Sequence, residues 1–72
     1  MIANVATTGE KLRRFRRGAA LTQSQLAKKA GVNQSTVAMI EGERRPNPHP
    51  ATLGKLARAL GVRAADLLDD SL

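Results

Sequence analysis

Apolar residues recur along this chain at helical spacing, and no stretch alternates apolar and polar residues as a strand does. Glycine and proline divide the pattern into short segments. The pattern predicts an all-α fold, a compact five-helix bundle with helices at residues 7 or 8–18, 23–30, 34–41, 50–60 and 64–69. The expected inward positions are Leu12, Phe15, Leu26, Ala27, Ala30, Val37, Ile40, Leu53, Leu56, Ala57, Leu60, Leu67 and Leu68.

Start and stop signals support these boundaries. Thr7 with Glu10, and Thr22 with Gln25, have the spacing of capping boxes, in which each side chain accepts a backbone N–H of the other residue. Further signals are Asn33 and His49 as caps, Pro50 at a first helical position, and Gly18, Gly31, Gly42 and Gly61 as helix ends. Gly54 interrupts the fourth helix, and we expect a neighbouring backbone to approach it closely.

Composition limits the possible chemistry. The chain has 72 residues, no cysteine and one histidine, which argues against thiol nucleophiles, disulfides and zinc sites and predicts a protein without metal or cofactor. No nucleophile has an adjacent base and no glycine-rich phosphate loop occurs, so an enzyme is not expected and neither is a small-molecule substrate. A chain of this length fits one small domain.

The domain organisation follows from the same segments. We expect a flexible N-terminal arm at 1–6, one domain at 7–69 and a short acidic tail at 70–72. The first six residues lack a basic region and a long apolar run, so they do not resemble a signal peptide, and a cytoplasmic protein without membrane association is predicted.

Charge indicates an anionic partner. The formal net charge is +6 and the pI is about 11.3. Five of the basic residues lie within residues 10–17, whereas Asp66, Asp69 and Asp70 make the opposite end of the chain acidic. Repulsion among Arg13, Arg14 and Arg17 on one short helix suggests that they face an anion. A partner held in one orientation, such as nucleic acid, suits this asymmetry better than general solubility does.

The second and third helices are separated by three residues, Gly31, Val32 and Asn33, which forces a sharp corner. Two short helices joined in this way form a helix-turn-helix, in which the first helix braces the second in the major groove of DNA. Ala27, Gly31, Val37 and Ile40 have the spacing that packs such a corner; they build the scaffold and do not themselves contact a ligand.

Several segments together resemble the phage lambda-type repressor and Cro family of helix-turn-helix transcriptional regulators. These are Gly9-Glu-Lys-Leu-Arg-Arg-Phe-Arg, Leu21-Thr-Gln-Ser-Gln-Leu-Ala, Ala30-Gly-Val-Asn-Gln-Ser-Thr-Val, Ile40-Glu41 and Lys55-Leu-Ala-Arg-Ala-Leu-Gly-Val. The resemblance covers about residues 9–69. It implies that the chain binds double-stranded DNA, most simply as a homodimeric repressor on a pseudo-palindromic operator.

Four residues on the third helix are the candidate base contacts: Gln34, Ser35, Ala38 and Met39. Gln34 is the strongest candidate, because its amide can donate to and accept from one adenine edge. The alternative is a solvated surface glutamine. Ser35 can bond to a base or to phosphate, and Ala38 and Met39 can touch a thymine methyl. Met39 is as well suited to filling a gap in the core.

Candidate contacts to the DNA backbone are Thr22, Gln23, Asn33, Arg44 and Arg45. Thr22 and Gln23 open the second helix, where free N–H groups and the helix dipole favour phosphate, although Thr22 can also serve simply as a cap. The resemblance implies a backbone contact at Gln23. Arg44 and Arg45 follow the third helix and either reach phosphate or stay solvated.

The resemblance also implies a structural ion pair between Arg16 and Glu41. Two other functions remain open at this point. One is the antitoxin of a toxin–antitoxin pair, which would bind a protein toxin as well as DNA. The other is a membrane-surface helix at 10–17, which is disfavoured because Leu12 and Phe15 are needed for the core. Leu68, Leu72, Ile2 and Val5 are candidates for a dimer interface.

Overall fold

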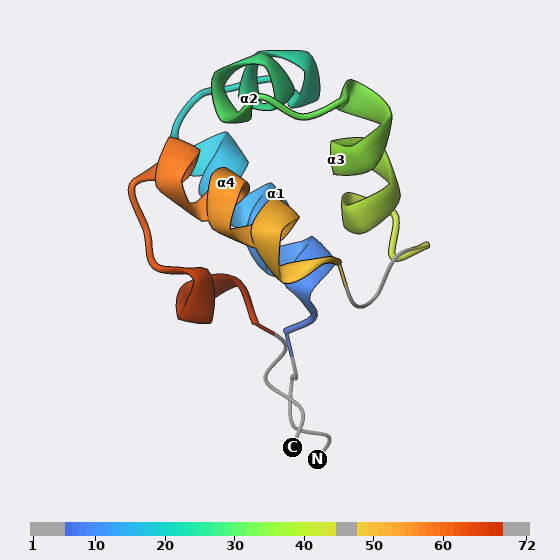
Figure 1. Cartoon of the computed structure of the whole chain (residues 1–72), viewed down its shortest axis with the longest axis vertical. Coiled ribbons are helices and arrows are strands. Elements are labelled where there is room, and N and C mark those ends of the chain that lie inside the picture. The colour runs from blue at the N-terminus through green and yellow to red at the C-terminus, as the bar shows by residue number, and fades with distance from the viewer. Residues whose placement is uncertain (1–5, 45–47, 69–72) are drawn as a thin grey trace.

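The computed structural model describes residues 6–44 and 48–68, and within them the fold is built from helices alone. The α-helices are α1 (Thr8–Gly18), α2 (Gln23–Ala30), α3 (Gln34–Glu41) and α4 (Pro50–Leu60), followed by a short 3₁₀ helix, η1 (Ala64–Leu67). In Figure 1, α2 lies at the top and α3 on the right, while α4 crosses the centre of the view. α2 packs against both α3 and α4, and α1 packs against α3.

The local capping signals act largely as expected. Thr7 and Glu10 form a capping box at α1, and Thr22 and Gln25 form one at α2. The Nδ1 atom of His49 accepts the N–H of Ala51 at 3.1 Å. Asn33 differs, because it precedes α3 in the expected conformation but its side chain makes no cap hydrogen bond.

Two helices end without a left-handed glycine. Gly42 follows α3 with a φ of −80°, and the left-handed residue is Glu43, with a φ of 60°. There the N–H of Glu43 bonds to the carbonyl of Ile40 and the N–H of Arg44 to that of Met39. Ala20, also at a φ of 60°, has the same place after α1. These bonds satisfy the last carbonyls of each helix and offset the strain of a side chain in this region.

The prediction of a fifth α-helix at 64–69 is wrong. The chain makes a single 3₁₀ turn, with bonds from the N–H of Asp66 to the carbonyl of Arg63 and from Leu68 to Ala65. One turn suffices to bury Leu67 completely against the core, and the backbone is already extended at Leu68, which is 52% exposed. Residues 69–72, and with them the acidic tail, lie outside the described residues, as do most of the arm at 1–6 and Arg45.

The core is formed by apolar residues from all five elements: Leu12, Leu26, Ala27, Val37, Ile40, Leu53, Leu56, Ala57 and Leu67. Phe15, Ala30 and Leu60, which were also expected inside, are half-buried against it. Truncating a buried leucine in a core of this kind costs about 2–5 kcal/mol. Because α1, α2 and α4 all contribute to this cluster, α3 is held at a fixed angle by Val37 and Ile40.

The close backbone approach occurs at Gly9 and not at Gly54. Among the described residues, nothing lies within 4 Å of a Cβ placed at Gly54, so the expected neighbour is absent there. A Cβ on Gly9, by contrast, would collide with the carbonyl oxygen of Ile40 and come within 3.2 Å of that of Glu41. Gly9 therefore allows the start of α1 to lie directly against the end of α3.

Candidate nucleic-acid interface

The corner between α2 and α3 fixes the orientation of α3. Gly31 adopts a φ of 73°, a left-handed conformation that a side chain would disfavour. The N–H of Val32 then bonds to the carbonyl of Ala27 at 3.0 Å, which closes the end of α2. Beyond the corner, Val37 and Ile40 are buried beside Leu26. One side of α3 is thus packed into the core, and the other side is exposed.

The outer side of α3 carries the candidate base contacts. Gln34, Ser35 and Ala38 are exposed, and Met39 is half-buried. Positions 34 and 38 lie one turn apart on a helix, so the amide of Gln34 and the methyl group of Ala38 share one face. Within the described part of the chain the side chain of Gln34 makes no hydrogen bond, and its amide is therefore free to pair with a base edge. Met39 lies at the border between this face and the core.

The N-terminal ends of α2 and α3 carry three of the candidate backbone contacts. Thr22 is exposed, and its Oγ1 accepts the N–H of Gln25 at 3.0 Å, so its hydroxyl serves as a cap. Asn33 is exposed too, and its side chain makes no hydrogen bond that caps α3. Gln23 is half-buried and turns its amide toward Glu41. A phosphate contact by Gln23 would have to use the second N–H of its side-chain amide or its backbone N–H.

A buried carboxylate connects these elements. Glu41, the last residue of α3, is 3% exposed. Arg16 on α1 donates to both of its oxygens, from Nε to Oε2 at 2.7 Å and from Nη2 to Oε1 at 3.0 Å. Gln23 donates from Nε2 to Oε1 at 3.1 Å. Arg16 also donates to the carbonyl of Leu21 at 2.8 Å. The pair implied by the resemblance is therefore present, within a network that joins α1, the start of α2 and the end of α3.

The network determines the protonation states of both ions. Burial opposes ionisation of Glu41, but hydrogen bonds from Arg16 and Gln23 and the charges of Arg16 and Arg13 outweigh it and hold the pKa of Glu41 below its ordinary value. The hydrogen bond to Glu41 likewise raises the pKa of Arg16. Both groups are charged at neutral pH, as a buried hydrogen-bonded pair must be to avoid an isolated buried charge.

Arg13 has a role that the sequence analysis missed. Its Nη2 donates to the backbone carbonyl of Glu41 at 2.9 Å, and its Nε lies 3.5 Å from Oε1 of the same residue. Arg13 thus caps the C-terminal end of α3, where a cation is favourable. The expectation of uncompensated repulsion among three arginines is wrong for Arg13 and applies only to Arg14 and Arg17, which are exposed.

The segment after α3 supplies an exposed cation. Arg44 is exposed, and its backbone N–H is held by the carbonyl of Met39 at 2.9 Å, so its side chain starts from a fixed position beside the end of α3. Together with the outer face of α3 and the N-terminal ends of α2 and α3, Arg44 forms a surface that combines uncharged side chains with a cation.

Comparison with known proteins agrees with the helix-turn-helix built by α2 and α3. Residues 8–70 match a family model described as a helix-turn-helix domain. The chain belongs to this helix-turn-helix family. It is 44% identical over 54 residues to the HTH-type transcriptional repressor RghR of Bacillus subtilis, covering 75% of this chain and 40% of that protein. It is 38% identical over 64 residues to the immunity repressor of Bacillus phage phi105, covering 89% and 44% respectively.

A solved structure is similar as well. The helix-turn-helix chain superimposes on the biofilm regulator SinR of Bacillus subtilis, in a crystal structure with DNA, with a TM-score of 0.82 at 31% identity. The match covers 85% of this chain and 97% of that one. The similarity to phage repressors inferred from the sequence is confirmed. The chain spans less than half the length of both curated relatives.

The membrane-surface hypothesis receives no support from α1. Leu12 is completely buried and Phe15 packs on the core, so the basic face of α1 has no free apolar anchor. Among the described residues, no helix is long and apolar enough to cross a bilayer.

Proposed function

We propose that this chain is a sequence-specific double-stranded DNA-binding domain of a transcriptional regulator, with α3 lying in the major groove. The observation that carries the proposal is the outer face of α3, where Gln34, Ser35 and Ala38 are exposed on a helix whose opposite face is locked into the core. A rigid helix with an uncharged polar face suits readout of base edges, since each base pair presents a distinct hydrogen-bond pattern in that groove.

Contacts to the DNA backbone give affinity and fix the position of the domain along the duplex. In this proposal Thr22, Gln23, Asn33 and Arg44 face phosphates on either side of α3, and Arg45 adds a further cation. Backbone contacts position such a domain without reading sequence. The net charge of +6 supports the same conclusion, because neutralised phosphates release counterions and strengthen binding at low salt.

Repression is the simplest mode of action. RghR and the phage phi105 protein are both named repressors, and an occupied operator blocks a promoter by exclusion. Because one recognition helix reads only a few base pairs, we propose that two copies bind a pseudo-palindrome with half-sites about 34 Å apart. Leu68 is exposed and is available for such a dimer, whereas Ile2, Val5 and Leu72 lie outside the described residues.

Selection of binding sites from random duplex DNA tests the proposal directly. The purified chain is incubated with a randomised library at physiological salt, and bound molecules are recovered through several rounds and sequenced. We expect enrichment of a two-fold-related motif whose half-sites are one helical turn apart. Recovery of sequences no different from the starting library would contradict sequence-specific binding, and enrichment of a single half-site would contradict the dimer alone.

A further inference from the structure

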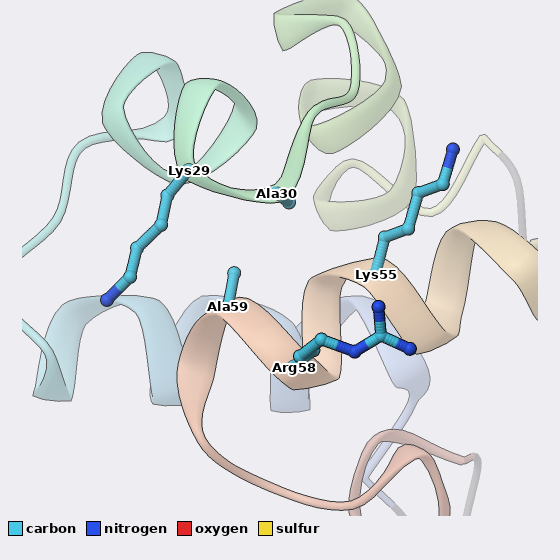
Figure 2. Close-up of a pocket in the computed structure, with 5 residues that line it drawn as sticks. All are labelled: Lys29, Ala30, Lys55, Arg58 and Ala59. Carbon is cyan, nitrogen blue, oxygen red and sulfur yellow. The ribbon is translucent and has the colours of Figure 1, made fainter.

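A second basic site lies between α2 and α4, and none of the candidate DNA contacts lines it. A pocket of about 300 Å³ is lined by Lys29 and Ala30 from α2 and by Lys55, Arg58 and Ala59 from α4. Figure 2 shows Lys29 extending from α2 on one side of the pocket and Lys55 rising from α4 on the other, with Arg58 extending from α4 below Lys55. The charged ends of Lys29 and Lys55 point away from each other in this view, and Ala30 and Ala59 lie between the two side chains. The two alanines keep the space between the cations open.

None of the three cations of this pocket has an acidic partner among the residues that the structure describes. In the described part of the chain, Lys29, Lys55 and Arg58 take part in none of the ion pairs, and no acidic residue lines the pocket. Lys55 and Arg58 lie three positions apart on one helix, where like charges repel. A cluster of this kind is unfavourable by itself and becomes favourable when an anion binds to it.

Helix capping explains only part of the cluster. Lys29 and Arg58 lie in the last turns of α2 and α4, where a cation interacts favourably with the helix dipole. Lys55 lies in the middle of α4, where the dipole gives no such reason for a cation. Another surface pocket, on α1, also contains arginines, but its positive charge is partly balanced. Glu10 lines that pocket, and its Arg13 is already bound to Glu41.

The shape and charge of the pocket indicate the class of ligand. Three positive charges match a phosphate dianion better than a single carboxylate, and the planar fork of arginine can bond two phosphate oxygens while each lysine acts as a point charge. The volume is at the lower end of the range for small-molecule sites. No aromatic side chain lines the pocket to stack on a base, so recognition is centred on the phosphate group itself.

We propose that the pocket formed by Lys29, Lys55 and Arg58 binds a small phosphate-bearing solute, either inorganic phosphate or a compact phosphate monoester. The site uses none of the residues assigned to DNA. The phosphate-binding proposal can therefore be tested independently of the proposed DNA-binding function.

The test is a titration of the ¹⁵N-labelled free chain, without DNA, followed by NMR. Inorganic phosphate is the first probe and glycerol 3-phosphate the second, each at an ionic strength kept constant with sodium chloride. We expect saturable shifts of the amide signals of residues 29, 30, 55, 58 and 59, and the tighter of the two probes identifies the source of the phosphate group. We expect Lys55→Gln to weaken binding about threefold to tenfold, the range for a charged contact that is partly solvated.

Lys28→Gln is the matched control. Lys28 is exposed in the same last turn of α2, and it does not line the pocket. This variant should bind phosphate like the parent chain, and both variants should keep the thermal unfolding midpoint of the parent. Shifts that do not saturate, or equal weakening by Lys28→Gln and Lys55→Gln, would overturn the proposal in favour of diffuse attraction to a basic surface.

Binding of duplex DNA by the same two variants separates this site from the DNA interface. We expect Lys55→Gln to retain the affinity of the parent chain and its dependence on salt. If Lys55→Gln instead weakened all duplexes alike and flattened the salt dependence, the pocket would be an extension of the DNA-backbone contacts. That outcome would overturn the small-solute proposal while leaving the DNA-binding proposal intact.

Discussion

Arg16 and Glu41 are 25 positions apart in the chain, yet the guanidinium of Arg16 bonds to both carboxylate oxygens of Glu41, at 2.7 and 3.0 Å. Their side chains are only 11% and 1% exposed. The contact fixes the C-terminal end of α3 to the last turn of α1. Any motion of α3 relative to the rest of the domain would have to break it.

Removing one ion of this pair should unfold much of the population. We expect Arg16→Met to lower the free energy of unfolding by about 3–5 kcal/mol, because it leaves the Glu41 carboxylate buried without its main partner. Urea denaturation followed by circular dichroism measures the change. Arg14→Met, at an exposed position on the same helix, is the control and should change stability by less than about 0.5 kcal/mol. Equal effects of the two substitutions would contradict the structural role of Arg16.

The same pair predicts a specific dependence of stability on pH. The pKa of Glu41 is lower in the folded chain than in the unfolded one. The contribution of its ionised carboxylate to the free energy of unfolding is therefore complete above the unfolded-state pKa, about 4.3. It is lost as the pH falls through the lower folded-state pKa. We expect the free energy of unfolding to decrease below about pH 5, and Glu41→Gln, although less stable at pH 7, to show a shallower decrease.

Urea denaturation of both proteins at a series of pH values from 7 down to 2 checks this expectation. Other acidic groups, including Asp66, whose pKa is lowered by its hydrogen bond to the N–H of Arg63, titrate in both proteins. The difference between the two curves therefore isolates Glu41. Parallel curves would mean that Glu41 has the same pKa folded and unfolded.

Local signals account for the parts of the fold that were predictable. Thr22 and Gln25 bond to each other across one helical turn, and Gly31 adopts the left-handed conformation that glycine favours, so both can be identified without knowing the rest of the chain. Likewise, Pro50 begins α4 because its missing N–H is not needed there. The corner between α2 and α3, and so the exposed face of α3, follows from signals of this kind.

The unpredicted parts depend on contacts between distant segments. Nothing near Arg13 in the chain distinguishes it from Arg14 or Arg17, and only the position of α3 reveals that Arg13 caps its end. The sequence likewise predicts only that Gln23 begins a helix, whereas in the structure its side-chain amide donates to Glu41 at 3.1 Å. The left-handed conformation of Glu43 also could not be predicted from the sequence, because the adjacent Gly42 is the residue that favours this conformation.

Two substitutions should separate specificity from affinity at the proposed DNA interface. Gln34→Ala removes an amide expected at a base edge, so we expect a loss of about 1–3 kcal/mol in discrimination at one base pair of each half-site. Arg44→Ala removes a phosphate contact, so we expect weaker binding to every sequence and a salt dependence reduced by about one unit of slope. Band-shift titrations on the selected operator and its single-base variants, at several salt concentrations, measure both. Identical behaviour of the two variants would mean that Gln34 does not read a base.

The glycines at positions 9 and 54 give a final prediction, in opposite directions. Gly9→Ala places a Cβ against the backbone carbonyl of Ile40, which cannot move without displacing α3, so we expect a loss of about 1–3 kcal/mol from overpacking. Gly54→Ala meets nothing within 4 Å and lies inside α4, so the higher helix propensity of alanine should add up to about 1 kcal/mol. Thermal and urea unfolding of both variants against the parent chain test the pair. If Gly9→Ala were neutral, α1 and α3 could not lie as close together as the structure places them, and the fixed position of the end of α3 would lose one of its supports.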